Sequence, residues 1–248
     1  MTLGTVVSLC DLTGNIVRPW AEAGYDCLCI DTCHPLRSGA HDGTITFQWG
    51  DVRSITPADL GTPCIVFAAP PCTNLAISGA RDFQRKGLQG LIDALQVVEA
   101  CRRLCEWYGC PWMLENPVSR LSSSWRKPDH MFDPCDYGDP YTKRTCLWTG
   151  GGFVMPPKHP VPATEGSKMH LMTPSADRAA LRSATPMGFA RAVFRANAPA
   201  HLALAKLAPG DMQFFNPLDA FATQKLRDNV LAALAATTHS ATEVAGRE

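Results

Sequence analysis

Short apolar segments separated by helical patterns make up the first half of the sequence. Four such segments predict strands, at residues 5–9, 26–31, 64–68 and 112–115. Helices are predicted at residues 17–23 and 88–107, and in the second of these apolar side chains recur at a spacing of about 3.6 residues. This alternation is typical of a mostly parallel sheet with helices on both faces, so we expect an α/β fold. Ligands of such sheets bind beyond the carboxyl ends of the strands.

The second half of the sequence is less regular. Residues 141–148 alternate as a strand does, which would place Thr142, Arg144 and Cys146 on one face. Residues 150–173 are rich in Gly, Pro, His and Lys, which predicts an exposed loop. Helices are expected at residues 186–207 and 217–236, followed by a frayed tail at residues 237–248.

Composition and charge exclude several classes of protein. No run of eighteen apolar residues is present, and the first residues do not resemble a signal peptide, so we expect a cytoplasmic protein with no membrane partner. The net charge is zero, from 23 basic and 23 acidic residues, so any nucleic-acid binding would need local basic clusters. Two such clusters follow the informative motifs below, one with Arg81, Arg85 and Lys86 and one with Arg120, Arg126 and Lys127.

Eleven cysteines, an odd number, predict mostly free thiols in a reducing compartment. Cys27, Cys29, Cys33 and His34 could form a metal cluster. However, Cys27 and Cys29 alternate with apolar residues in a predicted strand, which favours two buried side chains on one face. We therefore expect no metal.

Cys72 is the strongest candidate for a nucleophile. It follows the predicted strand at residues 64–68 and stands directly after Pro70 and Pro71, which form a rigid support at the functional edge of the sheet. A thiol is a strong soft nucleophile once it has thiolate character. The structural alternative is a small buried hydrophobic side chain.

Glu115 ends the next predicted strand and is followed by Asn116 and Pro117. A buried carboxylic acid is costly to leave unpaired. In its protonated form it can donate to a ring nitrogen and accept from an exocyclic amine, which matches the edge of cytosine. Alone, this segment could also be a turn or a helix cap.

Taken in order, these segments resemble the cytosine-C5 DNA methyltransferase family over about residues 5–205. The Pro-Cys loop of that family resembles Pro71-Cys72 through Ser78-Gly79, and its Glu-Asn-Val motif resembles Glu115-Asn116-Pro117. Its Gln-x-Arg-x-Arg strand falls on residues 142–146, and its closing motifs fall on residues 182–191 and 195–203. The resemblance implies a Rossmann-like, S-adenosylmethionine-dependent methyltransferase fold. It divides the chain into a catalytic core at residues 1–149, a reduced target-recognition insert at 150–184 and C-terminal helices and tail at 185–248.

The resemblance also implies a mechanism. Cys72 would add to C6 of a flipped-out cytosine in double-stranded DNA, Glu115 would hold the base edge, and Arg144 would support the pocket. S-adenosylmethionine would donate the methyl group. The residues implied to contact the cofactor are Asp11, Thr13, Gly14, Asn15, Asp31, Thr32, Asp51, Val52, Pro70 and Asn197.

Departures from the family pattern qualify these expectations. The glycine-rich turn of the family is reduced here to Asp11-Leu-Thr-Gly-Asn, and the second arginine of the strand motif is replaced by Cys146. The insert has room for few base-reading side chains, so we expect a very short target sequence. The residues expected to contact DNA are Ser78, Gly79, Arg81, Arg85, Lys86, Lys158, His159, Lys168 and His170.

Two alternatives remain open from the sequence. The substrate could be RNA, because no feature of the core excludes it. The chain could also be a catalytically inactive protein that binds DNA or cofactor, as the missing arginine and reduced glycine turn would allow. A nicotinamide-dependent oxidoreductase is disfavoured because no Gly-x-Gly-x-x-Gly follows the first strand. A monomer is the default expectation.

Overall fold

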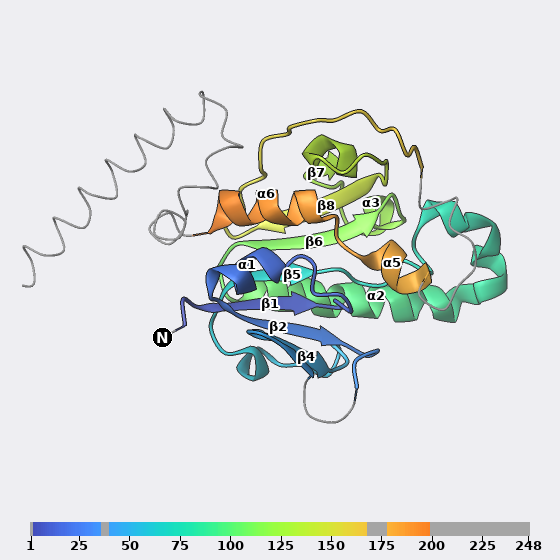
Figure 1. Cartoon of the computed structure of the whole chain (residues 1–248). Helices are drawn as coiled ribbons and strands as arrows, with labels where there is room; N and C mark the ends of the chain where they lie inside the picture. The colour runs from blue at the N-terminus through green and yellow to red at the C-terminus, as the bar shows by residue number, and fades with distance from the viewer. Residues whose placement is uncertain (1, 36–39, 168–177, 199–248) are drawn as a thin grey trace, which may run out of the picture. The chain divides into compact units, whose positions relative to one another are not determined.

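A computed structural model describes residues 2–35, 40–167 and 178–198 of the 248-residue chain. Its centre is an eight-stranded sheet (Figure 1) in the order β3-β4-β2-β1-β5-β6-β8-β7. The strands are β1 Thr5–Leu9, β2 Asp26–Asp31, β3 Ala40–Asp42, β4 Ile45–Trp49, β5 Pro63–Ala68, β6 Trp112–Pro117, β7 His130–Phe132 and β8 Thr145–Gly150.

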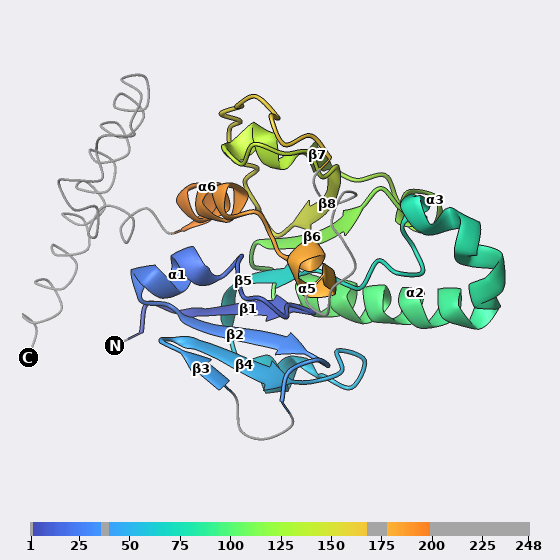
Figure 2. The same ribbon diagram turned by 45° about the vertical axis from the view of Figure 1, so that its right-hand side comes forward.

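The central strands are parallel and the edges are antiparallel. Strands β4, β2, β1, β5 and β6 run in one direction. Strand β8 is antiparallel to β6 and to β7, and β3 is antiparallel to β4 (Figure 2). The strand order therefore reverses between β1 and β5, which is the switch point of a Rossmann-like sheet and the usual place for its ligand.

The described helices are short, apart from one. The α-helices are α1 Arg18–Ala23, α2 Phe83–Trp107, α3 Leu121–Ser124, α5 Arg178–Ser183 and α6 Met187–Asn197. The 3₁₀ helices are η1 Pro57–Leu60, η2 Ile77–Asp82 and η3 Pro134–Tyr137.

Helices cover both faces of the sheet, as neighbouring residues of β5 show. Phe67 packs against Trp20 of α1, which in turn contacts Phe194 of α6. Val66 points the other way and joins a buried cluster with Val98 and Leu104 of α2. The expected Rossmann-like α/β fold, with a mostly parallel sheet and helices on both faces, is thus confirmed.

Most predicted elements in the first half are confirmed. β1 and β2 have the predicted bounds, and α1, β5 and β6 differ from their predictions by one or two residues. Helix α2 begins at Phe83, five residues early, but its backbone breaks at Gly87, where φ is 69° and ψ is −176°. The continuous part of the helix therefore begins at Leu88, as predicted. Cys27 and Cys29 are both buried on one face of β2, as their alternation indicated.

Other predictions were wrong in detail. The strand predicted at residues 141–148 begins only at Thr145, because the backbone N–H of Lys143 is bonded to Asp133 rather than to a neighbouring strand. Strand β6 continues past Glu115 to Pro117, which pairs with Thr145 as the last residue of the strand. At this end position a proline, which has no backbone N–H, is tolerated. The loop expected at residues 150–173 has no helix or strand from residue 151 to 167, its described part, and α5 follows within the insert.

Three short strands were not predicted from the sequence: β3, β4 and β7. The helix expected at residues 186–207 is described as α6 up to Asn197. The helix expected at 217–236 and the tail at 237–248 lie outside the described residues. Among the described residues, no helix is long and apolar enough to cross a membrane.

Candidate active site

The loop that carries Cys72 is fixed to β6 by several hydrogen bonds. Cys72 follows β5 by four residues, and its carbonyl oxygen accepts the N–H groups of Leu75 (2.9 Å) and Ala76 (2.8 Å). Asn116, fully buried at the end of β6, donates from Nδ2 to the carbonyl oxygen of Pro70 at 2.9 Å. An asparagine at this position therefore holds the Pro-Pro-Cys turn against the neighbouring strand.

Glu115 lies in the strand next to the Cys72 loop. Ala68, the last residue of β5, pairs with Leu114 of β6, so Glu115 comes one residue beyond that pair. The carboxyl ends of two neighbouring parallel strands thus bring the nucleophile candidate and the acid candidate to one edge of the sheet. The structure brings together the two residues that the sequence singled out.

Burial determines the protonation state of this pair. It raises the pKa of Glu115, and the ammonium of Lys143 offsets part of this effect. Burial also raises the pKa of Cys72, and the Glu115 carboxylate raises it further, whereas Lys143 and Arg182 lower it. Glu115 is therefore biased toward the protonated form, and the Cys72 thiolate depends on two neighbouring cations.

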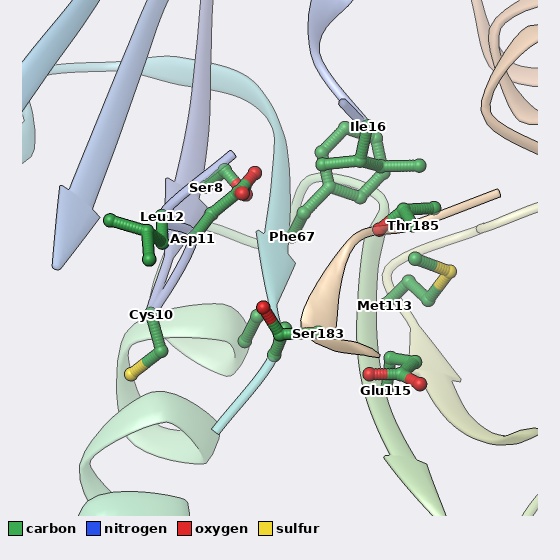
Figure 3. A pocket seen from close by; sticks show the side chains of 12 residues that line it. Ser8, Cys10, Asp11, Leu12, Ile16, Phe67, Met113, Glu115, Ser183 and Thr185 are labelled. Carbon is green, nitrogen blue, oxygen red and sulfur yellow. The ribbon is translucent and has the colours of Figure 1, made fainter. Parts of the chain in front are cut away.

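A pocket lies at the switch point between β1 and β5 and reaches Glu115. Its cavity measures about 20 Å³, room for about one water molecule, and is partly open to solvent. Figure 3 shows Ser8 and Asp11, from the β1 end, on the opposite side of the pocket from Met113 and Glu115, and the Cys10 thiol directed away from them toward α2. Ser183 and Thr185, at the end of α5 and just after it, line the same pocket.

The β1–α1 turn is organised by Asp11 instead of by several glycines. The carboxylate of Asp11 accepts the N–H groups of Thr13 (3.0 Å) and Gly14 (2.8 Å) and the hydroxyl of Ser8 (2.8 Å). Gly14 has a φ of 67°, and a Cβ there would meet the ring of Phe47 at 2.9 Å. One buried carboxylate and one glycine therefore fix the turn: Asp11 binds its backbone N–H groups, and the missing Cβ of Gly14 leaves room for the Phe47 ring.

Cys10 directly follows β1. Its backbone has a φ of 56°, a conformation that residues other than glycine rarely adopt. A hydrogen bond with Cys101 and burial raise the pKa of Cys10, and the carboxylates of Asp31 and Asp51 raise it further. The ends of β1, β2 and β4 therefore place these two carboxylates beside the same pocket edge.

The remaining cofactor candidates fall into two groups. Asp31 accepts the N–H of Cys33 at 2.8 Å, Thr32 is exposed, and Asp51 is paired with Arg53 beside the buried Val52. Asn15 donates to the carbonyl oxygen of Thr185 at 3.1 Å, which ties the β1–α1 turn to the segment before α6. All of these lie at the carboxyl edge of the sheet.

Asn197 does not join this group. It is the last residue of α6, roughly 15 Å along the helix from its start beside Thr185. Its Oδ1 accepts the N–H of Val154 at 2.8 Å, and its Nδ2 donates to the carbonyl oxygen of Val154 at 2.9 Å. The structure therefore gives Asn197 a role in holding the loop after β8 and does not bring it to the pocket.

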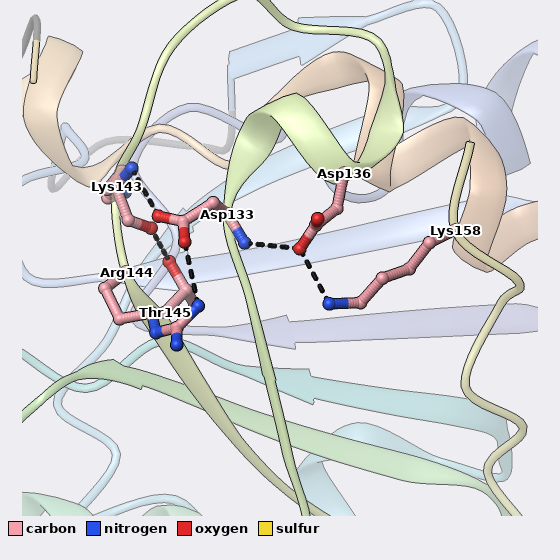
Figure 4. Close-up of polar contacts among 6 residues, drawn as sticks. All are labelled: Asp133, Asp136, Lys143, Arg144, Thr145 and Lys158. Atoms are coloured by element: carbon pink, nitrogen blue, oxygen red, sulfur yellow. Dashed lines mark hydrogen bonds and ion pairs between the residues drawn. The ribbon is translucent and has the colours of Figure 1, made fainter. Parts of the chain in front are cut away.

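Arg144 is also directed away from the pair of Cys72 and Glu115. Its guanidinium forms an ion pair with Asp133 at 2.9 Å, and its side chain is 57% exposed (Figure 4). Cys146, at the position of the missing second arginine, is buried in the core on the α2 side of the sheet. The expected supporting role of Arg144 remains a prediction.

The expected DNA-contacting residues are mostly exposed. Ser78 and Arg81 lie on η2 beyond Cys72, with the half-buried Gly79 between them, and Arg85 is exposed at the start of α2. Lys86 donates to the carbonyl oxygen of Thr73 and so supports the Cys72 loop.

Lys158 pairs with Asp136 at 2.9 Å (Figure 4), and the neighbouring His159 is exposed. Lys168 and His170 lie outside the described residues. Within the described part of the chain, no group of three or more His, Cys, Asp or Glu side chains is placed to hold a metal ion.

Sequence reasoning missed several residues of the site: Ser8, Asn116, Lys143, Arg182, Ser183 and Thr185. Lys143 and Arg182 stood beside residues of the recognised motifs, but the direction of their side chains was not readable from the sequence.

No family model and no curated protein matches the sequence. Among solved structures, similarity was found to the antibiotic-resistance methyltransferase Kmr, with 16% identity, a TM-score of 0.29, and coverage of 46% of this chain and 58% of that one. The CcbJ methyltransferase from Streptomyces caelestis has 16% identity and a TM-score of 0.29, with coverage of 52% and 48%. The glycopeptide N-methyltransferase MtfA has 15% identity and a TM-score of 0.28, with coverage of 60% and 66%.

The match spans about half the length of the first two of these proteins.

Proposed function

We propose that this chain is an S-adenosylmethionine-dependent methyltransferase that methylates C5 of a cytosine in double-stranded DNA. The observation that carries the proposal is the meeting of Cys72 and Glu115 at the ends of β5 and β6, beside a pocket at the switch point of the sheet. A thiol and a protonated carboxylic acid side by side suit addition to a pyrimidine ring better than transfer to an amine or a hydroxyl group.

The position of the pocket suits the proposed cofactor, and its cavity of about 20 Å³ has to widen to admit it. Asp31, at the end of β2, stands where a carboxylate can bind ribose hydroxyls in this type of fold. The β1–α1 turn, which Asp11 holds, borders the pocket. When bound here, S-adenosylmethionine would supply an electrophilic methyl group.

The protein's own groups account for activation of the base. Cys72 Sγ forms a bond to C6, and the C5=C6 electron pair shifts toward C5 and N3 while Glu115 donates its proton to N3. C5 is then nucleophilic and takes the methyl group. Loss of the C5 proton to water re-forms the C5=C6 bond, the C6–S bond breaks so that Cys72 leaves as a thiolate, and N3 returns its proton to Glu115.

The base must leave the helical stack to reach Cys72, because C6 is inaccessible inside a duplex. The exposed segment from Ser78 to Arg85 follows the Cys72 loop directly and offers two arginines for phosphate contact. Lys158 and His159 offer a second basic position on the insert. Their contacts with DNA belong to this proposal.

Transfer of labelled methyl groups from S-adenosylmethionine to duplex DNA tests the proposal, with nucleoside analysis of the product and tRNA as a parallel substrate. We expect label in 5-methylcytosine of DNA. Label only in tRNA would assign an RNA substrate instead, and label in neither, with cofactor still bound, would reject catalysis. Glu22→Gln, on the exposed side of α1, is the control for Glu115→Gln, which should lower the rate by roughly 10²- to 10⁴-fold.

A further inference from the structure

Residues 142–146, which resemble the Gln-x-Arg-x-Arg strand, do not supply the site with the two arginine cations that this motif predicts. Arg144 is held at the surface by Asp133, and Cys146 carries no charge and is buried in the core. Addition of a thiolate to a pyrimidine nevertheless places negative charge on the ring, and preformed positive groups at such a position strongly stabilise it. Another residue has to supply this charge.

Lys143 has the backbone geometry to do so. Its N–H donates to Asp133 Oδ1 at 3.0 Å, and its carbonyl oxygen accepts the hydroxyl of Thr145 at 2.8 Å (Figure 4). Asp133 thus binds the Lys143 backbone with one oxygen and the Arg144 guanidinium with the other. Residues 143 and 144 lie outside the strand. Asp133 binds the Arg144 guanidinium at the surface, whereas the Lys143 side chain extends toward Ala184.

The ammonium group of Lys143 is bonded to a segment that lines the pocket. Nζ donates to the carbonyl oxygen of Ala184 at 3.4 Å, and the residues on either side of Ala184, Ser183 and Thr185, line the pocket with Glu115. This single long hydrogen bond leaves donors of the ammonium group available for another partner.

The charged groups that face Cys72 come from three elements: Glu115 from β6, Lys143 from the segment before β8, and Arg182 from α5. The ammonium group of Lys143 also lowers the pKa of Glu115. It is therefore the cation shared by both members of the pair.

We propose that Lys143 is the catalytic cation of this site, pairing first with the thiolate of Cys72 and then with the partial negative charge that the attacked pyrimidine ring develops at O2, while Glu115 protonates N3. This inference rests on the proposed function for its second step. The first step concerns the free protein alone and needs neither cofactor nor DNA.

Alkylation of Cys72 by iodoacetamide tests the first step, measured on the full chain by peptide-resolved mass spectrometry from pH 6 to 10. Because the thiolate is the reactive form, Lys143→Met should slow alkylation of Cys72 at pH 8 by roughly three- to tenfold and move its pH profile upward. Lys143→Arg should restore the wild-type rate within about twofold, since it keeps the charge.

Lys127→Met is the matched control, because Lys127 is exposed and is not among the charges that act on Cys72. Its alkylation profile should equal that of the wild type. A second measurement on the unchanged protein guards against misfolding of the variant: raising NaCl to 1 M should slow alkylation of Cys72, because salt screens the cations. Equal Cys72 alkylation in wild type and a folded Lys143→Met, or no effect of salt, overturns the proposal.

Methyl transfer tests the second step. Lys143→Met should lower kcat by roughly 10²-fold with little change in KM for DNA, and Lys143→Arg should recover most of it. An unchanged kcat overturns this step. If the wild type transfers no methyl group to DNA, the proposed function fails, whereas the alkylation result still decides the pairing of Lys143 with Cys72.

Discussion

Glu115 shows how burial can prepare a single side chain for chemistry at some cost in stability. Its raised pKa means that the folded protein holds a proton on Glu115 more tightly than the unfolded chain does. The contribution to stability is fully present below the ordinary pKa of 4.5 and is lost as the pH rises toward the folded pKa. A protonated donor is what the proposed contact with the base requires.

We therefore predict that Glu115→Gln stabilises the protein, increasingly so as the pH rises. At pH 4 the two proteins should melt at similar temperatures, because Glu115 is protonated in both folded and unfolded wild type. By pH 8 the variant should melt at the higher temperature, because it has no carboxylate to bury. Thermal unfolding at pH 4, 6 and 8 measures this, with Glu22→Gln as the control. A melting difference that is the same at all three pH values would contradict it.

At the scale of elements, the β1–α1 turn depends on Asp11. We predict that Asp11→Ala lowers the free energy of unfolding by about 2–3 kcal/mol, because the N–H groups of Thr13 and Gly14 lose their acceptor. It should also weaken binding of S-adenosylmethionine, since the turn borders the pocket.

Urea denaturation and calorimetric titration with S-adenosylmethionine would measure both effects. Asp26→Ala, an exposed aspartate at the start of β2, is the control and should change stability by less than about 0.5 kcal/mol. Equal stability of Asp11→Ala and Asp26→Ala would refute the role given to Asp11.

Elements with a strong apolar or helical pattern were predictable from the sequence. β1, β2, β5 and α2 each bury enough apolar surface for their pattern to determine them. β3 was not predictable, because its residues are polar and fully exposed and its pairing with β4 depends on a neighbour in space. β4 does alternate through Ile45 and Phe47, so its signal was present and was missed.

The reactive residues of the site were predictable from the sequence, but the directions of the side chains around them were not. The positions of Cys72 and Glu115 follow from the strands that precede or contain them, because parallel strands end at one edge. The side-chain directions of Arg144 and Lys143 could not be read from the sequence. They depend on Asp133, which lies in a different segment and binds the Lys143 N–H and the Arg144 guanidinium.

At the scale of the whole molecule, the described residues offer the proposed DNA substrate little surface for base recognition. The net charge is zero, and the insert between β8 and α6 contains only one short helix in its described part. Few side chains can therefore contact base edges, and each good contact contributes only about 1–3 kcal/mol of discrimination.

We predict that methylation of a random-sequence DNA pool follows a very short consensus of a few base pairs. Sequencing of methylated positions measures this directly, with Cys72→Ala protein as the background control. A long and strict consensus would show that the recognition surface has been underestimated.

The central claim is that Cys72 forms a covalent bond to cytosine, and a DNA duplex carrying 5-fluorocytosine tests it most directly. Fluorine replaces the C5 proton whose loss releases Cys72, so the bond between Sγ and C6 should persist after methyl transfer. The account predicts a denaturation-resistant protein–DNA complex that requires S-adenosylmethionine, is absent with Cys72→Ala and maps to the peptide containing Cys72. A complex that forms equally with Cys72→Ala, or methylation of cytosine by that variant, would contradict it.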